Sequence, residues 1–298
     1  MDLSGDQSFA WLVLELLSKA VDGMLGVIAL LFYYVDRLFP RVKVGGRESQ
    51  QAYSEWEYEV GGELLERYSA HFGSLAGKAV LDIGCGLGGK TVAYSEAGAD
   101  VVGVDIELQN ISQSIIFARS RASGAAFAVG DAEMLPFHDQ TFDLVVANDS
   151  LEHFPHPEAV LPELARVLRP GGSIFLFFTP WGSPLGSHLY DYIRTPWCHL
   201  VFSEGLIEAI LEIVLEKRGI GQAKKEAERL IGQFHTELNR ITVARYRRIL
   251  KAAATVETVL EELRPAKFAF LSPLTKLPLV GELFTGTVVG ILRKKEVG

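Results

Sequence analysis

Residues 80–91 have the sequence VLDIGCGLGGKT, in which a short apolar run leads through closely spaced glycines into the start of a helical pattern. A strand, a glycine-rich turn and a helix in this order form the first part of a βαβ unit. Starting at Gly84, the stretch satisfies GxxxxGK[ST], the pattern of a phosphate-binding P-loop, and also GxGxxG, the pattern of a dinucleotide site. The glycines therefore predict a ligand at the end of the strand but do not identify it.

Strand and helix patterns alternate on both sides of this stretch. Apolar runs rich in Val, Ile and Phe predict strands at 78–83, 100–105, 125–129, 142–147 and 173–178, with two more at 267–271 and 285–292. Helical patterns lie between them at 88–96, 108–123 and 157–168, the last closed by a turn at 169–172. We therefore expect a doubly wound α/β fold with a mostly parallel, seven-stranded sheet. Ligands bind at the carboxyl ends of the strands in such sheets.

These patterns divide the chain into four segments. Residues 1–47 are an apolar N-terminal helical segment and linker, and 48–180 are the α/β core. Residues 181–263 are expected to be a helical insertion, a lid over the acceptor site, with helices at 204–218 and about 222–263. Residues 264–298 supply the closing strand pair. The second of the two insertion helices is expected to carry Arg240, Arg247, Arg248 and Lys251 on one face.

The charges around the glycine loop separate the candidate ligands. The predicted strands end on acids, namely Asp82, Asp105, Asp131 and Asp149, against the single base Lys90. Two like charges about 4 Å apart repel by roughly 4 kcal/mol even at a moderate effective dielectric. A site with this balance disfavours a triphosphate, so we reject the P-loop. Lys90 is then expected in the exposed first turn of a helix, dispensable for the ligand.

A ligand with an adenosine group and positive charge fits these acids better. Asp105 lies 21 residues after Gly84, where an acid binds the ribose hydroxyls of an adenosine. Asp82 would repel a pyrophosphate but would pair with the α-ammonium of S-adenosyl-L-methionine (AdoMet), whose sulfonium is a second positive charge. The acids thus favour AdoMet over a dinucleotide.

The chain also resembles the class I AdoMet-dependent methyltransferases, specifically the type 11 branch that includes ubiquinone- and menaquinone-type enzymes. The resemblance covers roughly residues 50–180 and rests on four runs: VLDIGCGLGG, VVGVDI, GDAEMLPFHDQTFDLVVANDSLEHF and RVLRPGG. It implies that the amino-acid end of AdoMet is wrapped by Asp82, Gly84, Cys85, Gly86 and Gly88. It implies that Asp105 and Ile106 hold the ribose and adenine face, and that Asp131, Ala132 and Glu133 bind the adenine edge. Asn148 and Asp149 would face the sulfonium.

The methyl acceptor is less well defined by the sequence. Methyl transfer from a sulfonium depends mainly on alignment, and a base is needed only when the nucleophile must lose a proton. Candidates are His188, which we rank first, His153 and Tyr190. An aromatic-rich stretch after residue 180 and the apolar termini favour a small or lipid-like hydrophobic acceptor. The alternative is a catalytically silent AdoMet-fold subunit that binds partners or a membrane.

Composition and the N-terminus limit the partners and the location. A net charge of −8 disfavours nucleic acid. Two cysteines are too few for a disulfide framework or a structural zinc site, so we expect no metal and a cytoplasmic protein. Residues 9–39 are mostly apolar with a narrow polar stripe. They predict a helix that packs on its own domain, that pairs two copies in a homodimer, or that contacts a membrane surface peripherally on its cytoplasmic face, whereas their longest uncharged run is short for a membrane span.

Overall fold

The computed structural model describes residues 23–41, 45–46, 48–266, 272–278 and 280–296. The described chain forms two compact units. The sheet unit comprises the described residues of Lys43–Gly186 and Glu237–Gly298. The helical unit comprises residues 23–41 and Ser187–Thr236. Each is described by itself.

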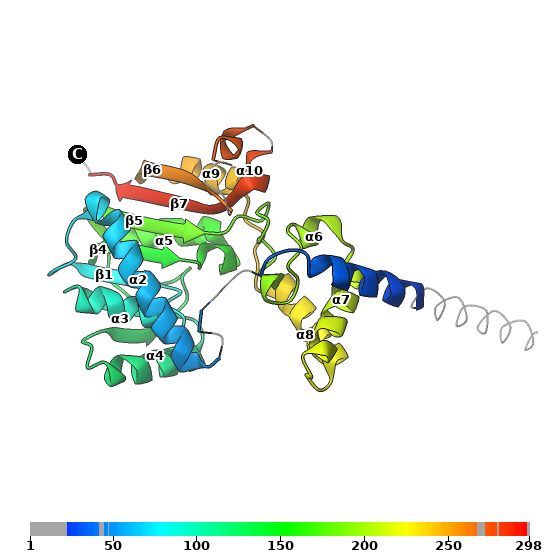
Figure 1. Cartoon of the computed structure of the whole chain (residues 1–298). Coiled ribbons are helices and arrows are strands. Elements are labelled where there is room, and N and C mark those ends of the chain that lie inside the picture. The colour runs from blue at the N-terminus through cyan, green and yellow to red at the C-terminus, as the bar shows by residue number, and fades with distance from the viewer. Residues whose placement is uncertain (1–22, 42–44, 47, 267–271, 279, 297–298) are drawn as a thin grey trace, which may run out of the picture. The chain divides into compact units, whose positions relative to one another are not determined.

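A seven-stranded sheet forms the centre of the sheet unit, in the order β3-β2-β1-β4-β5-β7-β6 (Figure 1). Its strands are β1 (Ala79–Ile83), β2 (Asp100–Asp105), β3 (Ala126–Val129), β4 (Phe142–Asn148), β5 (Leu168–Phe178), β6 (Val256–Pro265) and β7 (Thr285–Lys294). The first five strands pair in parallel, and β7 pairs antiparallel with both β5 and β6. This confirms the expected doubly wound, mostly parallel α/β fold.

Both faces of the sheet are covered by helices, because successive residues of a strand point to opposite faces and both sets are apolar here. On one face Val80, Leu144 and Phe175 join α2 (Gln50–Phe72) and α3 (Gly89–Glu96) in a core cluster. On the other, a second cluster joins the sheet to α5 (Pro157–Val167) and α9 (Val243–Ala252). Figure 1 shows α2 crossing the sheet face beside α3 and α4 (Leu108–Ser120).

Three expectations for the sheet unit were wrong in detail. Strand β6 (Val256–Pro265) begins inside the segment that was expected to continue as helix to residue 263, and it pairs with β7 instead. Strand β5 begins at Leu168, so the expected turn at 169–172 lies inside the strand. Arg240 precedes α9 and stacks over the Trp181 ring, so it does not share a helix face with Arg247. The expected strand at 267–271 lies outside the described residues.

The remaining short elements close the sheet unit. They are η1 (Leu151–His153) after β4, η4 (Leu274–Lys276), and α10 (Gly281–Phe284) before β7. Glu282 on α10 accepts hydrogen bonds from the backbone N–H of Gly182 and of Val243, 2.8 and 2.9 Å away. This carboxylate therefore ties the segment that follows β5 to the start of α9.

Helices form most of the helical unit. They are a helix over residues 23–36, η2 (Leu189–Asp191), α6 (Cys198–Val201), α7 (Glu204–Lys217) and α8 (Ala223–Thr236). Ser203 caps α7 by accepting from the backbone N–H of Leu206. Residues 9–22 of the expected N-terminal helix lie outside the described residues. Among the helices that the structure describes, none has the length and apolar character needed to span a bilayer.

Candidate cofactor-binding and active site

The glycine loop connects β1 to α3 and turns sharply at three glycines. Gly84, Gly86 and Gly88 have φ of 69°, 55° and 78°, in the left-handed region that favours glycine. Gly89 is required for a different reason, since a Cβ there would lie 2.1 Å from the backbone oxygen of Ser54 on α2. The loop is thus held between the end of β1 and the face of α2.

The strand order brings the predicted acids to one edge of the sheet. Because β3, β2, β1 and β4 are neighbours and parallel, Asp131, Asp105, Asp82 and Asp149 follow one another at their carboxyl ends. The Asp105 carboxylate accepts hydrogen bonds from the backbone N–H of Gly86 at 3.0 Å and of Glu107 at 2.9 Å. Asp105 therefore joins the glycine loop to the end of β2.

Asp82 lies deepest in this row and is almost fully buried. Its Oδ2 accepts a hydrogen bond of 2.6 Å from the Thr91 hydroxyl on α3. Burial raises the pKa of Asp82 to about 7, although the Thr91 hydroxyl and the charge of Lys90 oppose that rise. Its ionisation near neutral pH is therefore sensitive to a cation placed beside it.

The residues predicted to hold the adenine lie at the ends of β2 and β3. The Ile106 side chain is 65% exposed, which is unusual for isoleucine and suits a residue that a flat apolar ligand covers. Asp131 is exposed and accepts from the backbone N–H of Glu133, whereas Ala132 is buried. Ala132 is therefore part of the core and offers little surface to a ligand.

At the end of β4, polar side chains are buried beside the loop. The Asn148 side-chain NH₂ donates to the Tyr94 hydroxyl at 3.0 Å. Asn148 Oδ1 and Ser150 Oγ are buried and have no hydrogen-bond partner among the described residues. A Cβ on Gly84 would lie 2.6 Å from the Ser150 Cβ, so this strand end touches the loop. Buried oxygens without donors are costly, and a polar ligand would supply donors.

Lys90 is not in the exposed position expected from the sequence. Its side chain is only 10% exposed, and its ammonium lies 3.3 Å from Glu57 Oε1 on α2 and 3.9 Å from Asp149 Oδ2. Burial alone would lower the pKa of Lys90, but the charges of Glu57 and Asp149 raise it overall, so Lys90 stays charged. Glu57 was not predicted from the sequence. Its helix, α2, precedes every motif in the chain, and only the packing of α2 against the loop brings Glu57 next to Lys90.

Cys85 takes part in the loop through its backbone. A Cβ on Gly103 of β2 would lie 3.0 Å from Cys85 Sγ, so the thiol points into the sheet. Burial raises the pKa of the Cys85 thiol well above its usual value. The thiol is therefore neutral and is not a nucleophile.

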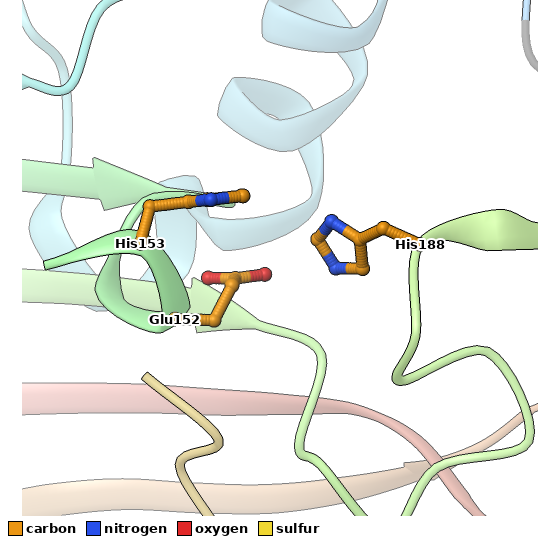
Figure 2. Close-up of side chains that lie close together, drawn as sticks. All are labelled: Glu152, His153 and His188. Carbon is orange, nitrogen blue, oxygen red and sulfur yellow. The ribbon is translucent and has the colours of Figure 1, made fainter. Parts of the chain in front are cut away.

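One catalytic candidate, His153, follows β4 on the short helical turn η1, where Glu152 precedes it. Figure 2 shows Glu152 and His153 side by side on this turn. His153 Nδ1 lies 2.8 Å from the carbonyl oxygen of Glu237, which can only accept. Nδ1 therefore carries hydrogen, and neutral His153 has Nε2 as its basic nitrogen.

Glu152, unlike its exposed neighbour His153, is buried. It is 3% exposed, and its Oε1 accepts from the backbone N–H of Thr179 at 3.1 Å. Burial, reinforced by the charge of Asp149, raises the pKa of Glu152 to about 8. Glu152 was not among the candidates predicted from the sequence; the available signal was its position three residues after Asp149 in NDSLEH.

The other two catalytic candidates belong to the helical unit. His188 precedes η2 with a φ of 57°, and its ring centroid lies 6.1 Å from that of Tyr190. The sheet unit therefore contains His153 but neither His188 nor Tyr190.

A cavity of about 740 Å³ lies elsewhere in the sheet unit, between α9, β6 and residues 272–282. None of the residues predicted to bind the cofactor lines it. We therefore place the site by its side chains at the edge of the sheet and not by this cavity.

The sheet order with an antiparallel β7, the glycine loop after β1 and the acid at the end of β2 define a class I AdoMet-dependent methyltransferase fold. Residues 81–176 match the family model described as a methyltransferase domain, type 11. The chain therefore contains a class I methyltransferase domain of this family, and the family implies the use of AdoMet.

Two curated relatives illustrate the sequence similarity. The chain is 37% identical over 121 residues to a ubiquinone biosynthesis O-methyltransferase of Parvibaculum lavamentivorans, covering 38% of this chain and 47% of that protein. It is 38% identical over 111 residues to sterol 24-C-methyltransferase ERG6B of Gibberella zeae, covering 36% and 29%. The chain thus spans half or less of the length of these relatives.

A solved structure agrees in fold. The PH0226 protein of Pyrococcus horikoshii has a TM-score of 0.53 at 23% identity, covering 80% of this chain and 91% of that one. At this identity the similarity establishes the fold alone.

Proposed function

We propose that the chain is an AdoMet-dependent methyltransferase that transfers a methyl group to a small or lipid-like hydrophobic acceptor. The observation that supports it most is the row of acids beside the glycine loop, with Asp105 bonded to Gly86 and Asp82 buried next to the loop. Acids in this arrangement suit a ligand with an adenosine and two positive charges.

The residues fit AdoMet in three ways. The glycine loop leaves space for a close ligand at Gly86. Among the described residues outside the loop, the one atom within 4 Å of a Cβ added to Gly86 is a Glu57 carboxylate oxygen at 3.7 Å. Asp82 would pair with the α-ammonium and Asp105 with the ribose hydroxyls. The exposed Ile106 would be covered by the adenine. When bound, AdoMet supplies an activated methyl group on a sulfonium.

The protein residues then orient the acceptor and remove a proton where the acceptor requires it. Of the catalytic candidates predicted from the sequence, His153 lies in the sheet unit, and its Nε2 is the nitrogen that accepts a proton when Nδ1 donates to the Glu237 carbonyl. The raised pKa of Glu152 means that its carboxyl group is mostly protonated at neutral pH. The group therefore carries little negative charge that would repel the Asp149 carboxylate.

A hydrophobic acceptor is supported by the relatives. One is named for ubiquinone biosynthesis and the other as a sterol methyltransferase. Ubiquinones and sterols are apolar molecules of membranes, and one enzyme methylates oxygen whereas the other methylates carbon. We therefore propose an acceptor of this physical class, met at the cytoplasmic face of a membrane, and leave the methylated atom open.

The alternative is a catalytically silent subunit, which has the methyltransferase fold but transfers no methyl group. Calorimetry of the full chain with AdoMet, followed by mass spectrometry of lipid extracts incubated with both, separates the two functions. A mass gain of one CH₂ unit in an extracted lipid supports the enzyme. Binding of AdoMet without any methylated product would favour the silent subunit.

AdoMet binding is expected to weaken below neutral pH. The raised pKa of Asp82, about 7, means that Asp82 is largely protonated at pH 6 and largely ionised at pH 7.5. Only the ionised form pairs with the α-ammonium, so we expect affinity to fall roughly fivefold to tenfold between those values. Calorimetry at both pH values measures this change. Asp82→Asn should bind weakly at both, and a wild-type affinity that does not change with pH would exclude this pairing.

His153→Gln is expected to lower kcat by about 10²–10⁴-fold if the acceptor is a hydroxyl, because the variant has no basic nitrogen. AdoMet affinity should stay unchanged, as measured by calorimetry. The matched control is His156→Gln, an exposed histidine three residues further on. Equal kcat for the two variants with a hydroxyl acceptor would exclude His153 as the base.

A further inference from the structure

The helix of residues 23–36 has two faces of different kinds. One packs within the helical unit: Leu25 lies against Gly205, and the Phe32 ring centroid is 4.8 Å from that of Phe202. The opposite face is exposed and wholly apolar, with side chains between 36% and 82% exposed. Its residues are Met24, Val27, Ile28, Leu30, Leu31, Tyr34 and Val35, followed by Leu38 in the turn after the helix. An apolar surface of this extent and continuity is typical of a binding site.

Arginines lie at the carboxyl end of this apolar face. Asp36 is buried, and its Oδ1 accepts from the backbone N–H of Arg194 and of Thr195, both at 2.7 Å. The Arg194 side chain also donates to the carbonyl oxygen of Arg37 at 3.4 Å. These bonds fix Arg194 beside the end of the helix.

The arginines are close enough to repel one another. Burial, and then the positive charges of Arg37 and Arg41, lower the pKa of Arg194. Arg194 Nε is buried and has no hydrogen-bond partner among the described residues. Between residues 23 and 41 the only acid is Asp36, which is buried. Asp36 Oδ2 lies 3.5 Å from Arg37 Nη1, so within residues 23–41 the exposed charge beside the apolar face belongs to arginines.

We infer that this surface, which consists of the apolar face together with Arg37, Arg41 and Arg194, docks the helical unit on an anionic lipid surface. Apolar side chains of an interfacial helix enter the boundary between headgroups and acyl chains, and arginines at its end bind phosphate groups. A second copy of the chain fits less well. A twofold contact would pair this surface with itself, and the surface contains no exposed carboxylate to meet its own arginines.

The inference does not depend on methyl transfer, because it concerns a surface of the helical unit and none of the proposed cofactor residues. Vesicle binding and AdoMet binding are separate measurements on the same variants. If AdoMet binds but vesicles do not, only the docking inference fails.

The test is co-sedimentation of the full chain with vesicles of phosphatidylcholine, alone or mixed with phosphatidylglycerol. We expect roughly tenfold stronger binding to the mixed vesicles at low salt, and a smaller difference at high salt. Arg37→Gln/Arg41→Gln should lose most of that preference. Val27→Ser/Leu31→Ser should bind both vesicles less. The matched control is Lys224→Gln/Lys225→Gln, which removes two exposed charges from α8 and should behave as wild type.

Two results would overturn the inference. One is equal vesicle binding by all variants. The other is a dimer in light scattering that Val27→Ser/Leu31→Ser dissociates, with no binding to either vesicle, which would assign the apolar face to a second copy of the chain.

Discussion

Replacing Lys90 by methionine is expected to lower the free energy of unfolding by about 3–5 kcal/mol, because it leaves the buried Glu57 carboxylate without its partner. In the wild type the Lys90 ammonium is 3.3 Å from Glu57 Oε1, and both side chains are at most 10% exposed. A buried charge that loses its counter-charge costs far more than an exposed one. Urea denaturation of the full chain, followed by circular dichroism, measures the change.

A double variant separates the charge effect from a packing effect. Lys90→Met/Glu57→Gln removes both charges, so it should recover most of the lost stability. The control is Lys251→Met, which removes an exposed lysine of α9 and should change stability by about 0.5 kcal/mol or less. If Lys90→Met is as stable as Lys251→Met, the buried ion pair has no role in stability.

The loss in Lys90→Met should also shrink as the pH falls. Burial raises the pKa of Glu57 above its ordinary value of 4.5, and removing Lys90 raises it further. For a group whose pKa is higher in the folded state, the stabilising contribution is complete below the unfolded pKa and is lost as pH rises. The difference between variant and wild type is therefore expected to be smaller near pH 5 than near pH 8.

Sequence alone predicted the features that depend on local order along the chain. The glycine loop, the acids at the strand ends and the doubly wound sheet follow from short motifs and from the alternation of strands and helices. Strand β6 was missed because VETVLEELRP is rich in Leu and Glu, which favour helices, whereas its pairing with β7 is a long-range contact. Lys90 was misplaced for a similar reason, since Glu57 lies 33 residues before it.

The burial of Lys90 also changes how the ligand can be tested. A variant of Lys90 would disturb the end of β4 through Asp149 as well as α2 through Glu57. Weaker AdoMet binding in such a variant would therefore not show that Lys90 touches the ligand. A residue that lies on the same strand as Asp105, but far from the loop, makes a better control.

Asp105→Ala is expected to weaken AdoMet binding by at least about 100-fold, because the variant loses the two hydrogen bonds that the ribose hydroxyls donate to the Asp105 carboxylate. The control is Asp100→Ala, an exposed acid at the opposite end of β2. Calorimetry with AdoMet measures both variants, and thermal melting shows whether each is folded. Equal affinity in both variants would contradict the ribose assignment of Asp105.

Asp105 also accepts from the backbone N–H of Gly86, so Asp105→Ala has two possible effects: it removes the contact with the ribose, and it loosens the glycine loop. A second ligand separates these two effects. Methylthioadenosine retains the adenosine of AdoMet but has neither the α-ammonium nor the carboxylate. Asp105→Ala should weaken the binding of both ligands by a similar factor, since both present the same ribose. Asp82→Asn should weaken AdoMet but leave methylthioadenosine unchanged. If Asp105→Ala instead affects AdoMet alone, its carboxylate acts by holding the loop around the amino-acid end, and the ribose is bound elsewhere.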